Sequence, residues 1–338
     1  MLRLYKPIVD DIFDLHSILE TLVCDVWCEA NDDDCNLKKS EDLKKISHYN
    51  VSKGISFDNE IDRIYNIFKT LSEEEKEKVK EAWNVNNDIE RLCDNKISPI
   101  PLDVLPEVVR KDIKPLFKWC YEELLGKAKV KGSKLEYYQN LIKENKFFVC
   151  PCCGLIDFED EESICREAYD HYLPKALYPM ASVNFKNLVP LCNKCNTDRK
   201  KANDPINEGR KAFYPFYEGE HNIKITVDIS NSKDLDNLKV DDVNINLIGD
   251  VEKINTWNDL FSIKFRYGSY IKNKSKGILR EMKRRHRANK GLDPNVTYLN
   301  TIDNEINLYQ DDIYDDKKFL KVSFLEYVKS REDILDVY

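Results

Sequence analysis

Four cysteines and an adjacent aspartate and histidine stand within one stretch of the chain and could form a chemically active site. Two Cys-x-x-Cys pairs bracket the Asp170-His171 dipeptide. Each pair presents two sulfurs from one tight turn, and two such turns supply the four thiolates of a tetrahedral structural zinc site. The predicted zinc ligands are Cys150, Cys153, Cys192 and Cys195.

The segment between the two cysteine pairs is long enough to hold a second site. It has 38 residues, whereas a simple zinc ribbon uses roughly 15–20. It contains Asp170, His171 and Asn187, and Asn196 directly follows the last cysteine. A carboxylate and an amide oxygen suit a hard divalent cation, and a neutral imidazole can take a proton from water.

The order and spacing of Asp170-His171, Asn187 and Asn196 resemble the HNH (ββα-metal) endonuclease family, zinc-knuckle type with Asn in the last motif position. The resemblance covers residues 147–218. It implies two antiparallel strands and a helix around one divalent cation, with the Asp-His dipeptide ending the first strand. The chain is also similar to HNH nucleases of bacterial antiphage or restriction-type systems, which often lie beside an ATPase gene.

The resemblance also implies roles for the four residues. His171 would be the general base, and Asn187 would brace the loop that orients it. Asp170 and Asn196 would bind a catalytic Mg²⁺ or Mn²⁺. Zinc at the cysteines would be structural, because a closed thiolate site leaves no position for substrate.

The remaining cysteines are interpreted as ordinary small apolar residues in a chain of reduced thiols. The chain has 11 cysteines in total. Cys152 does not fit the two-residue spacing and is left out of the zinc site. Cys24 and Cys28, four residues apart, could alternatively share a helix face and hold a metal.

The net charge of −8 conceals a strongly basic segment. Residues 262–290 contain 11 Lys and Arg against one acid, a local +10, so the remainder carries −18. We expect this segment to contact phosphate through Lys283, Arg284, Arg285 and Arg287. The alternative is that the basic residues pair with the acidic remainder or with an acidic partner.

Three basic residues beside the predicted metal site are further candidates for phosphate contact. They are Arg199, Lys200 and Lys201; Lys194 in the same segment is a fourth, and Lys175 is a weaker candidate. A solvated helix face is the other interpretation of the three.

The order of patterns predicts an α+β fold with three regions. Residues 1–146 are predicted to be a helical region that docks a partner or acts as a scaffold. Residues 147–218 hold the nuclease core with its zinc knuckles. Residues 219–338 hold a strand pair and a basic helical region. At 338 residues the length fits two or three domains of about 150 residues each.

Composition favours a soluble cytoplasmic protein without a membrane partner. Hydrophobic residues make up 42% of the chain, and it contains neither an 18-residue apolar run nor a signal-peptide pattern at its start.

Taken together, the sequence and its resemblance to the HNH family predict a metal-dependent endonuclease acting on nucleic acid, with DNA the expected substrate. The resemblance also implies a bacterial defence system with an ATPase subunit as a candidate partner. The alternatives are a zinc-knuckle nucleic-acid-binding module without catalysis, an inactive nuclease, and a mobile-element HNH nuclease.

Overall fold

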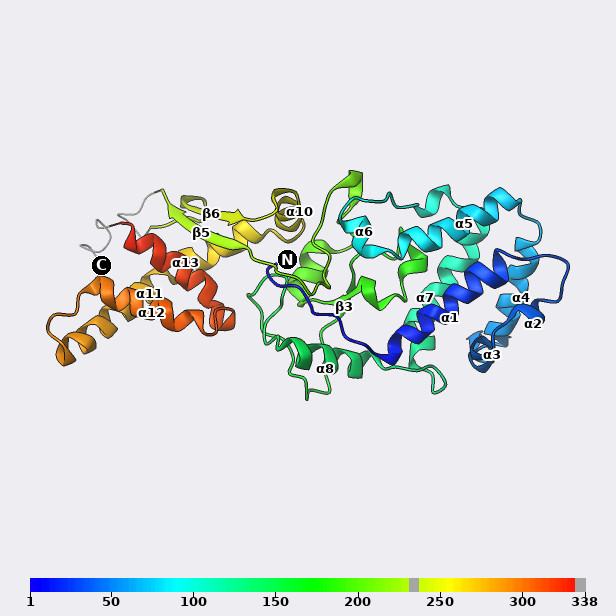
Figure 1. The fold of residues 1–338 in the computed structure, drawn as a ribbon, viewed down its shortest axis with the longest axis horizontal. Helices are drawn as coiled ribbons and strands as arrows, with labels where there is room; N and C mark the ends of the chain where they lie inside the picture. Colours follow the sequence, from blue (N-terminus) through cyan, green and yellow to red (C-terminus); the bar gives the residue numbers. More distant parts are fainter. Residues whose placement is uncertain (231–236, 332–338) are drawn as a thin grey trace. The chain divides into compact units, whose positions relative to one another are not determined.

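Among the described residues, helices and three two-stranded antiparallel sheets make up the fold, which confirms the predicted α+β class (Figure 1). The computed structural model describes residues 1–230 and 237–331. The helices are α1 Asp14–Thr21, α2 Cys35–Lys38, α3 Glu41–Ile46, α4 Phe57–Phe68, α5 Glu73–Asn86, α6 Ile89–Cys93, α7 Lys114–Glu122, α8 Lys134–Asn145, α9 Asn193–Cys195, α10 Val251–Phe261, α11 Ile263–Leu292, α12 Tyr298–Gln310 and α13 Lys318–Lys329. The strands are β1 Asn50–Ser52, β2 Ile55–Ser56, β3 Tyr169–His171, β4 Leu188–Pro190, β5 Lys224–Ile229 and β6 Val243–Ile248. Within the described ranges, no helix is long and apolar enough to cross a membrane.

The chain divides into two compact units that differ from the three predicted regions. One unit holds Leu4–Phe147 and Phe158–Glu218, and the other holds Met1–Arg3, Phe148–Asp157 and Gly219–Tyr338. The predicted boundary after residue 218 coincides with a boundary between units. The predicted boundary after residue 146 lies one residue from the unit boundary after Phe147, and residues 158–218 of the predicted core belong to the same unit as the helical region.

The helical region starts with one long helical segment. Residues 11–27 run as a continuous helical segment in which α1 leads into a π turn, Leu22–Trp27. A capping box starts α5, since Ser72 Oγ accepts a hydrogen bond from Glu75 N and a Glu75 carboxylate oxygen accepts one from Ser72 N. Trp27 at the end of this segment stacks on Phe68 of α4, which fixes these helices against one another.

Helix α8 attaches the helical region to the strand that carries the Asp-His dipeptide. Tyr137 on α8 is buried, and its ring lies edge-on to Phe185 with 5.1 Å between centroids. Phe185 in turn lies 5.5 Å from Tyr169, the first residue of β3. The hydroxyl of Tyr169 donates to the carbonyl of Lys134 at the start of α8. These contacts give β3 a rigid support.

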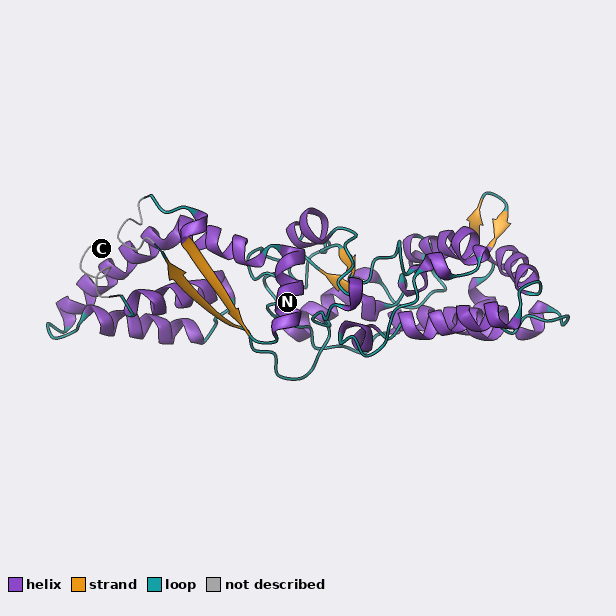
Figure 2. Cartoon of the chain, turned by 90° about the horizontal axis from the view of Figure 1, so that it is seen from above, coloured by secondary structure: helices purple, strands orange, loops and turns teal. Residues whose placement is uncertain are grey.

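The second unit is built on a longer hairpin, seen as the long orange strand pair in Figure 2. Its strands β5 and β6 pair from Lys224 opposite Ile248 to Ile229 opposite Val243, which confirms the two predicted strands. The alternating buried residues of the hairpin face α11 and α13, as a half-buried strand pair requires. Tyr327 and Ser323 of α13 donate hydrogen bonds to carbonyls of β5.

Candidate nuclease site and zinc centre

The strand pair β3–β4 positions the predicted catalytic dipeptide. Asp170 lies opposite Val189 and His171 opposite Leu188 in an antiparallel register. Because successive side chains of a strand point to opposite faces, the carboxylate and the imidazole leave the strand in different directions. Asp170 is 3% exposed, whereas His171 is half-buried.

The side chain of Asn187 ties together the loop that follows His171. It is fully buried just before β4, and its Oδ1 accepts a hydrogen bond from Leu173 N at 2.7 Å. Its Nδ2 donates to the carbonyls of Leu173 and Ala181, at 3.1 and 3.2 Å. The amide therefore joins both ends of the segment 173–181, a position suited to the bracing role that the sequence predicts for it.

The imidazole of His171 is held in one tautomer by a backbone carbonyl. Its Nε2 lies 3.0 Å from Ser182 O, and since a carbonyl only accepts, Nε2 carries the hydrogen and Nδ1 carries the lone pair of the neutral ring. Burial and the nearby positive charge of Lys175 lower the pKa of His171 to about 3. The ring is therefore neutral at physiological pH, the state in which it can accept a proton.

Tyr121 and Lys134 surround His171 and were not found by sequence reasoning. The Tyr121 ring on α7 lies edge-on to the imidazole, with centroids 4.6 Å apart. Lys134 Nζ lies 4.0 Å from the centre of the same tyrosine ring and donates to the Tyr121 carbonyl, and burial lowers its pKa to about 8. Lys175 Nζ lies 5.5 Å from that ring and 3.2 Å from Glu122 Oε1. The contacts of Tyr121 and Lys134 with this site could not be predicted from the motif, because both residues lie far from it in sequence.

The carboxylate of Asp170 is paired with a buried lysine, Lys200. The Lys200 Nζ lies 3.2 Å from Asp170 Oδ1 and 3.0 Å from Oδ2, and it donates to the His171 carbonyl at 3.0 Å. Only Oδ1 meets hydrogen-bond geometry, so Oδ2 is a buried oxygen without a hydrogen-bond donor among the described residues. Burial raises the pKa of Asp170, and the Lys200 ammonium offsets part of that rise. A buried carboxylate oxygen that accepts no hydrogen bond fits the ligand set of a hard divalent cation, and in this structure its charged neighbour is the Lys200 ammonium.

Asn196 is the first residue of the π turn in the short helical segment that ends at Lys200. The segment begins as α9 and continues as a π turn, Asn196–Lys200, which is closed by a 2.8 Å bond from Lys201 N to Asn196 O. Asn196 is half-buried. The last residue of this turn, Lys200, contacts the Asp170 carboxylate, so the turn links Asn196 to Asp170. The helical segment ends at Lys200.

The three basic residues of this segment do not share one face. Arg199 and Lys201 are exposed, whereas the Lys200 side chain is 0% exposed. The π turn changes the spacing from that of an α-helix, so the direction of Lys200 does not follow from α-helical periodicity. Phosphate contact therefore stays a prediction for Arg199 and Lys201, while in this structure Lys200 faces Asp170 instead of solvent.

The four predicted zinc ligands come together. The sulfur atoms of the cluster lie within 4.8 Å of one another, and all four residues are buried. The donor set of four thiolates suits zinc. The members are Cys150, Cys153, Cys192 and Cys195.

Backbone turns shape both cysteine pairs. Gly154 N and Cys153 N donate to the Cys150 carbonyl, and Cys195 N donates to the Cys192 carbonyl. Gly154 has φ of +65°, and a Cβ there would lie 2.5 Å from a Leu2 methyl carbon, so the first turn requires glycine. Cys152 lies outside the cluster, as its spacing predicted.

The basic segment lies on α11, and one of its arginines is already paired. Arg285 lies 2.8 Å from Glu281 and 2.9 Å from Glu305, whose side chain is 4% exposed. Lys283, Arg284 and Arg287 are exposed, and the described part of the chain offers none of them an ion pair. Of the four residues expected to contact phosphate, Arg285 is therefore the one to which the alternative applies, since it pairs with acidic residues of the chain.

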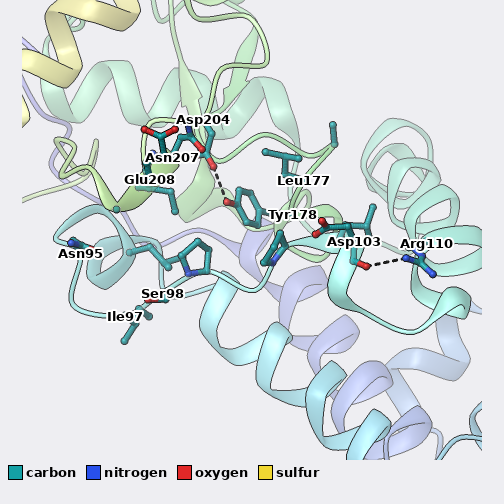
Figure 3. A pocket seen from close by; sticks show the side chains of 17 residues that line it. Asn95, Ile97, Ser98, Asp103, Arg110, Leu177, Tyr178, Asp204, Asn207 and Glu208 are labelled. Atoms are coloured by element: carbon teal, nitrogen blue, oxygen red, sulfur yellow. Dashed lines mark hydrogen bonds between the residues drawn. The ribbon is translucent and has the colours of Figure 1, made fainter.

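A separate pocket lies among loops next to the predicted core, and Figure 3 shows its lining side chains. Its volume is about 710 Å³. Tyr178 donates to Asp204 Oδ2 at 2.7 Å on one side of the pocket, and Arg110 donates to the Asp103 carbonyl at 2.9 Å on the other. None of the four motif residues is among its described lining residues.

Comparisons with known proteins find partial similarity to two proteins. Protein ea31 of Escherichia phage lambda is 32% identical over 118 residues, which are 35% of this chain and 36% of that protein. Septu protein PtuB of Bacillus thuringiensis is 33% identical over 125 residues, which are 33% of this chain and 44% of that protein. The chain thus spans less than half the length of each. No family model and no solved structure matches it.

Proposed function

We propose that this chain is a metal-dependent endonuclease of the HNH type that cleaves DNA. The observation that carries the proposal is the anchored His171 next to a buried Asp170 whose Oδ2 lacks a hydrogen-bond donor among the described residues. A general base needs a fixed lone pair, and a hard cation needs an unsatisfied oxygen. One short strand supplies both.

In the proposed reaction, His171 Nδ1 takes a proton from the attacking water. The Ser182 carbonyl holds the opposite ring nitrogen, so the lone pair keeps its direction while the proton moves. The Asn187 amide fixes the loop that carries this carbonyl. Asp170 and Asn196 are the residues that would hold Mg²⁺ or Mn²⁺, which when bound would stabilise charge on the phosphoryl and leaving oxygens.

Substrate binding is assigned to two basic surfaces. The first is the wall beside His171 formed by Lys134 and Lys175. The second is one face of α11, which at about 100° per residue carries a row of basic residues roughly 27 Å long. The row consists of Lys272, Lys276, Arg280, Lys283, Arg287 and Lys290, and the exposed Arg284 lies beside it, one turn after Arg280. A straight row of this length suits the phosphates of an extended backbone, whose charge dominates binding.

A role in bacterial defence, with an ATPase subunit as partner, remains part of the proposal. It rests on the resemblance in the motif region, and the partial similarity to Septu protein PtuB is in keeping with it. A binding module without catalysis is the competing function, and the buried Lys200 on Asp170 is the observation in its favour, since it already neutralises the carboxylate.

The test is cleavage of supercoiled plasmid, and of a single-stranded RNA in parallel, by purified protein in Mg²⁺. His171→Ala should lose activity by about a hundredfold or more, the usual worth of a general base. His48→Ala is the matched control, because His48 is exposed and its ring contacts only Tyr49 among the described ring pairs. Equal cleavage by both variants and the unmodified protein would remove His171 from the mechanism. Binding without cleavage by the unmodified protein would favour the binding module.

A further inference from the structure

The buried ammonium group of Lys200 occupies a place that a cation-binding site normally leaves for the metal. Its side chain is 0% exposed and that of Asp170 is 3% exposed, and the charged atoms are 3.0 Å apart. The Tyr172 ring lies 5.9 Å from Nζ and adds a further favourable contact for a cation. The carboxylate therefore has one positive charge beside it before any metal binds.

The backbone around Lys200 is shaped to send this side chain inward. The π turn ends at Lys200, and the next residue, Lys201, has φ of 54° and ψ of −128°. Residues other than glycine rarely adopt this conformation, and such strain persists only where surrounding contacts enforce it. π turns inside helices are frequent at functional sites. The inward lysine is thus held by the local fold and is not a loosely placed surface side chain.

A divalent ion on Asp170 would have to share the carboxylate with this lysine. Asp170 Oδ2, the oxygen without a hydrogen-bond donor among the described residues, is also the oxygen closer to Nζ. Two cations a few ångströms apart in a site shielded from water repel each other strongly. Binding of the ion and close contact of Lys200 with Asp170 therefore oppose each other.

We propose that Lys200 is a positioning residue, a tethered cation that holds Asp170 in the absence of the divalent ion and weakens the site's affinity for it. This inference rests on the proposed metal-dependent nuclease site.

Calorimetric titration of Mn²⁺ into zinc-loaded protein tests the proposal without any cleavage assay. Lys200→Met should bind Mn²⁺ about tenfold more tightly or better, because the competing charge is gone. Lys194→Met is the control, since it makes the same change in an exposed side chain of the same helical segment and should leave the affinity unchanged. Asp170→Asn should bind weakly. Unchanged or weaker binding by Lys200→Met would overturn the proposal.

Loss of Lys200 leaves a buried carboxylate unpaired, so a second measurement covers a variant that folds poorly. Thermal melts with and without Mn²⁺ should show a larger rise in Tm for Lys200→Met than for the unmodified protein, since tighter binding to the folded state stabilises it more. An equal or smaller rise would overturn the proposal. If the unmodified protein shows Mg²⁺-dependent cleavage while Lys200→Met fails both tests, only the role of Lys200 is refuted. If Mg²⁺-dependent cleavage is absent, the proposed function fails.

Discussion

Replacing Lys283, Arg284 and Arg287 with Gln should flatten the salt dependence of DNA binding. These three side chains are exposed and have no ion pair among the described residues, so each is available for a phosphate. Each phosphate contact contributes about −0.9 to the slope of log affinity against log salt, so three contacts contribute about −2.7. Between roughly 50 and 200 mM salt, the unmodified protein should therefore lose about 40-fold more affinity than the triple variant.

The assay is a fluorescence titration of a labelled duplex at four salt concentrations, with Arg285→Gln as the matched control. Arg285 is paired with two acids, one of them the buried Glu305. Its loss should leave the slope nearly unchanged and lower stability by about 1–3 kcal/mol, the cost of a buried group losing its partner. An unchanged slope in the triple variant, or an equal change in Arg285→Gln, would refute the assignment of α11 to phosphate contact.

Three further predictions concern the metal centre and the fold. Cys192→Ser should lose zinc and unfold, since zinc contributes roughly 10 kcal/mol or more to such sites, whereas Cys152→Ser should keep one zinc per chain by elemental analysis. Burial lowers the pKa of His16 in the folded chain, and it lowers that of His221 to about 4. Below the ordinary histidine pKa of about 6.5, the unfolded chain therefore binds more protons than the folded chain. Tm should therefore fall as pH drops from about 6.5 toward 4, and a pH-independent Tm over that range would contradict the burial of these rings. Lys201→Gly should raise stability by about 1 kcal/mol in urea unfolding, because glycine tolerates the positive φ; a destabilised variant would argue against strain there.

Local patterns in the sequence predicted the elements and the metal cluster well. The strand pair within residues 219–338 and the four zinc ligands each depend on spacing within one or two short segments. The position of the dipeptide at the end of β3 was implied by the resemblance to the HNH family.

One local irregularity and several long-range contacts account for what the sequence did not predict. The inward direction of Lys200 depends on a π turn, which leaves no recognisable pattern in the residues. Tyr121 and Lys134 reach His171 only because α7 and α8 pack beside β3. The pairing of Arg285 with Glu305 joins α11 to α12, two helices whose contact no spacing rule specifies.

Restoring a metal-depleted protein tests the central claim most directly. Protein treated with a chelator that removes weakly bound ions, and shown by elemental analysis to retain one zinc, is mixed with supercoiled plasmid with and without Mg²⁺. We predict no cleavage without Mg²⁺, cleavage when it is added, and none by His171→Ala in either condition. Cleavage by the zinc-only protein, or by His171→Ala in Mg²⁺ at the rate of the unmodified chain, would contradict a divalent ion at Asp170 working with His171 as the base.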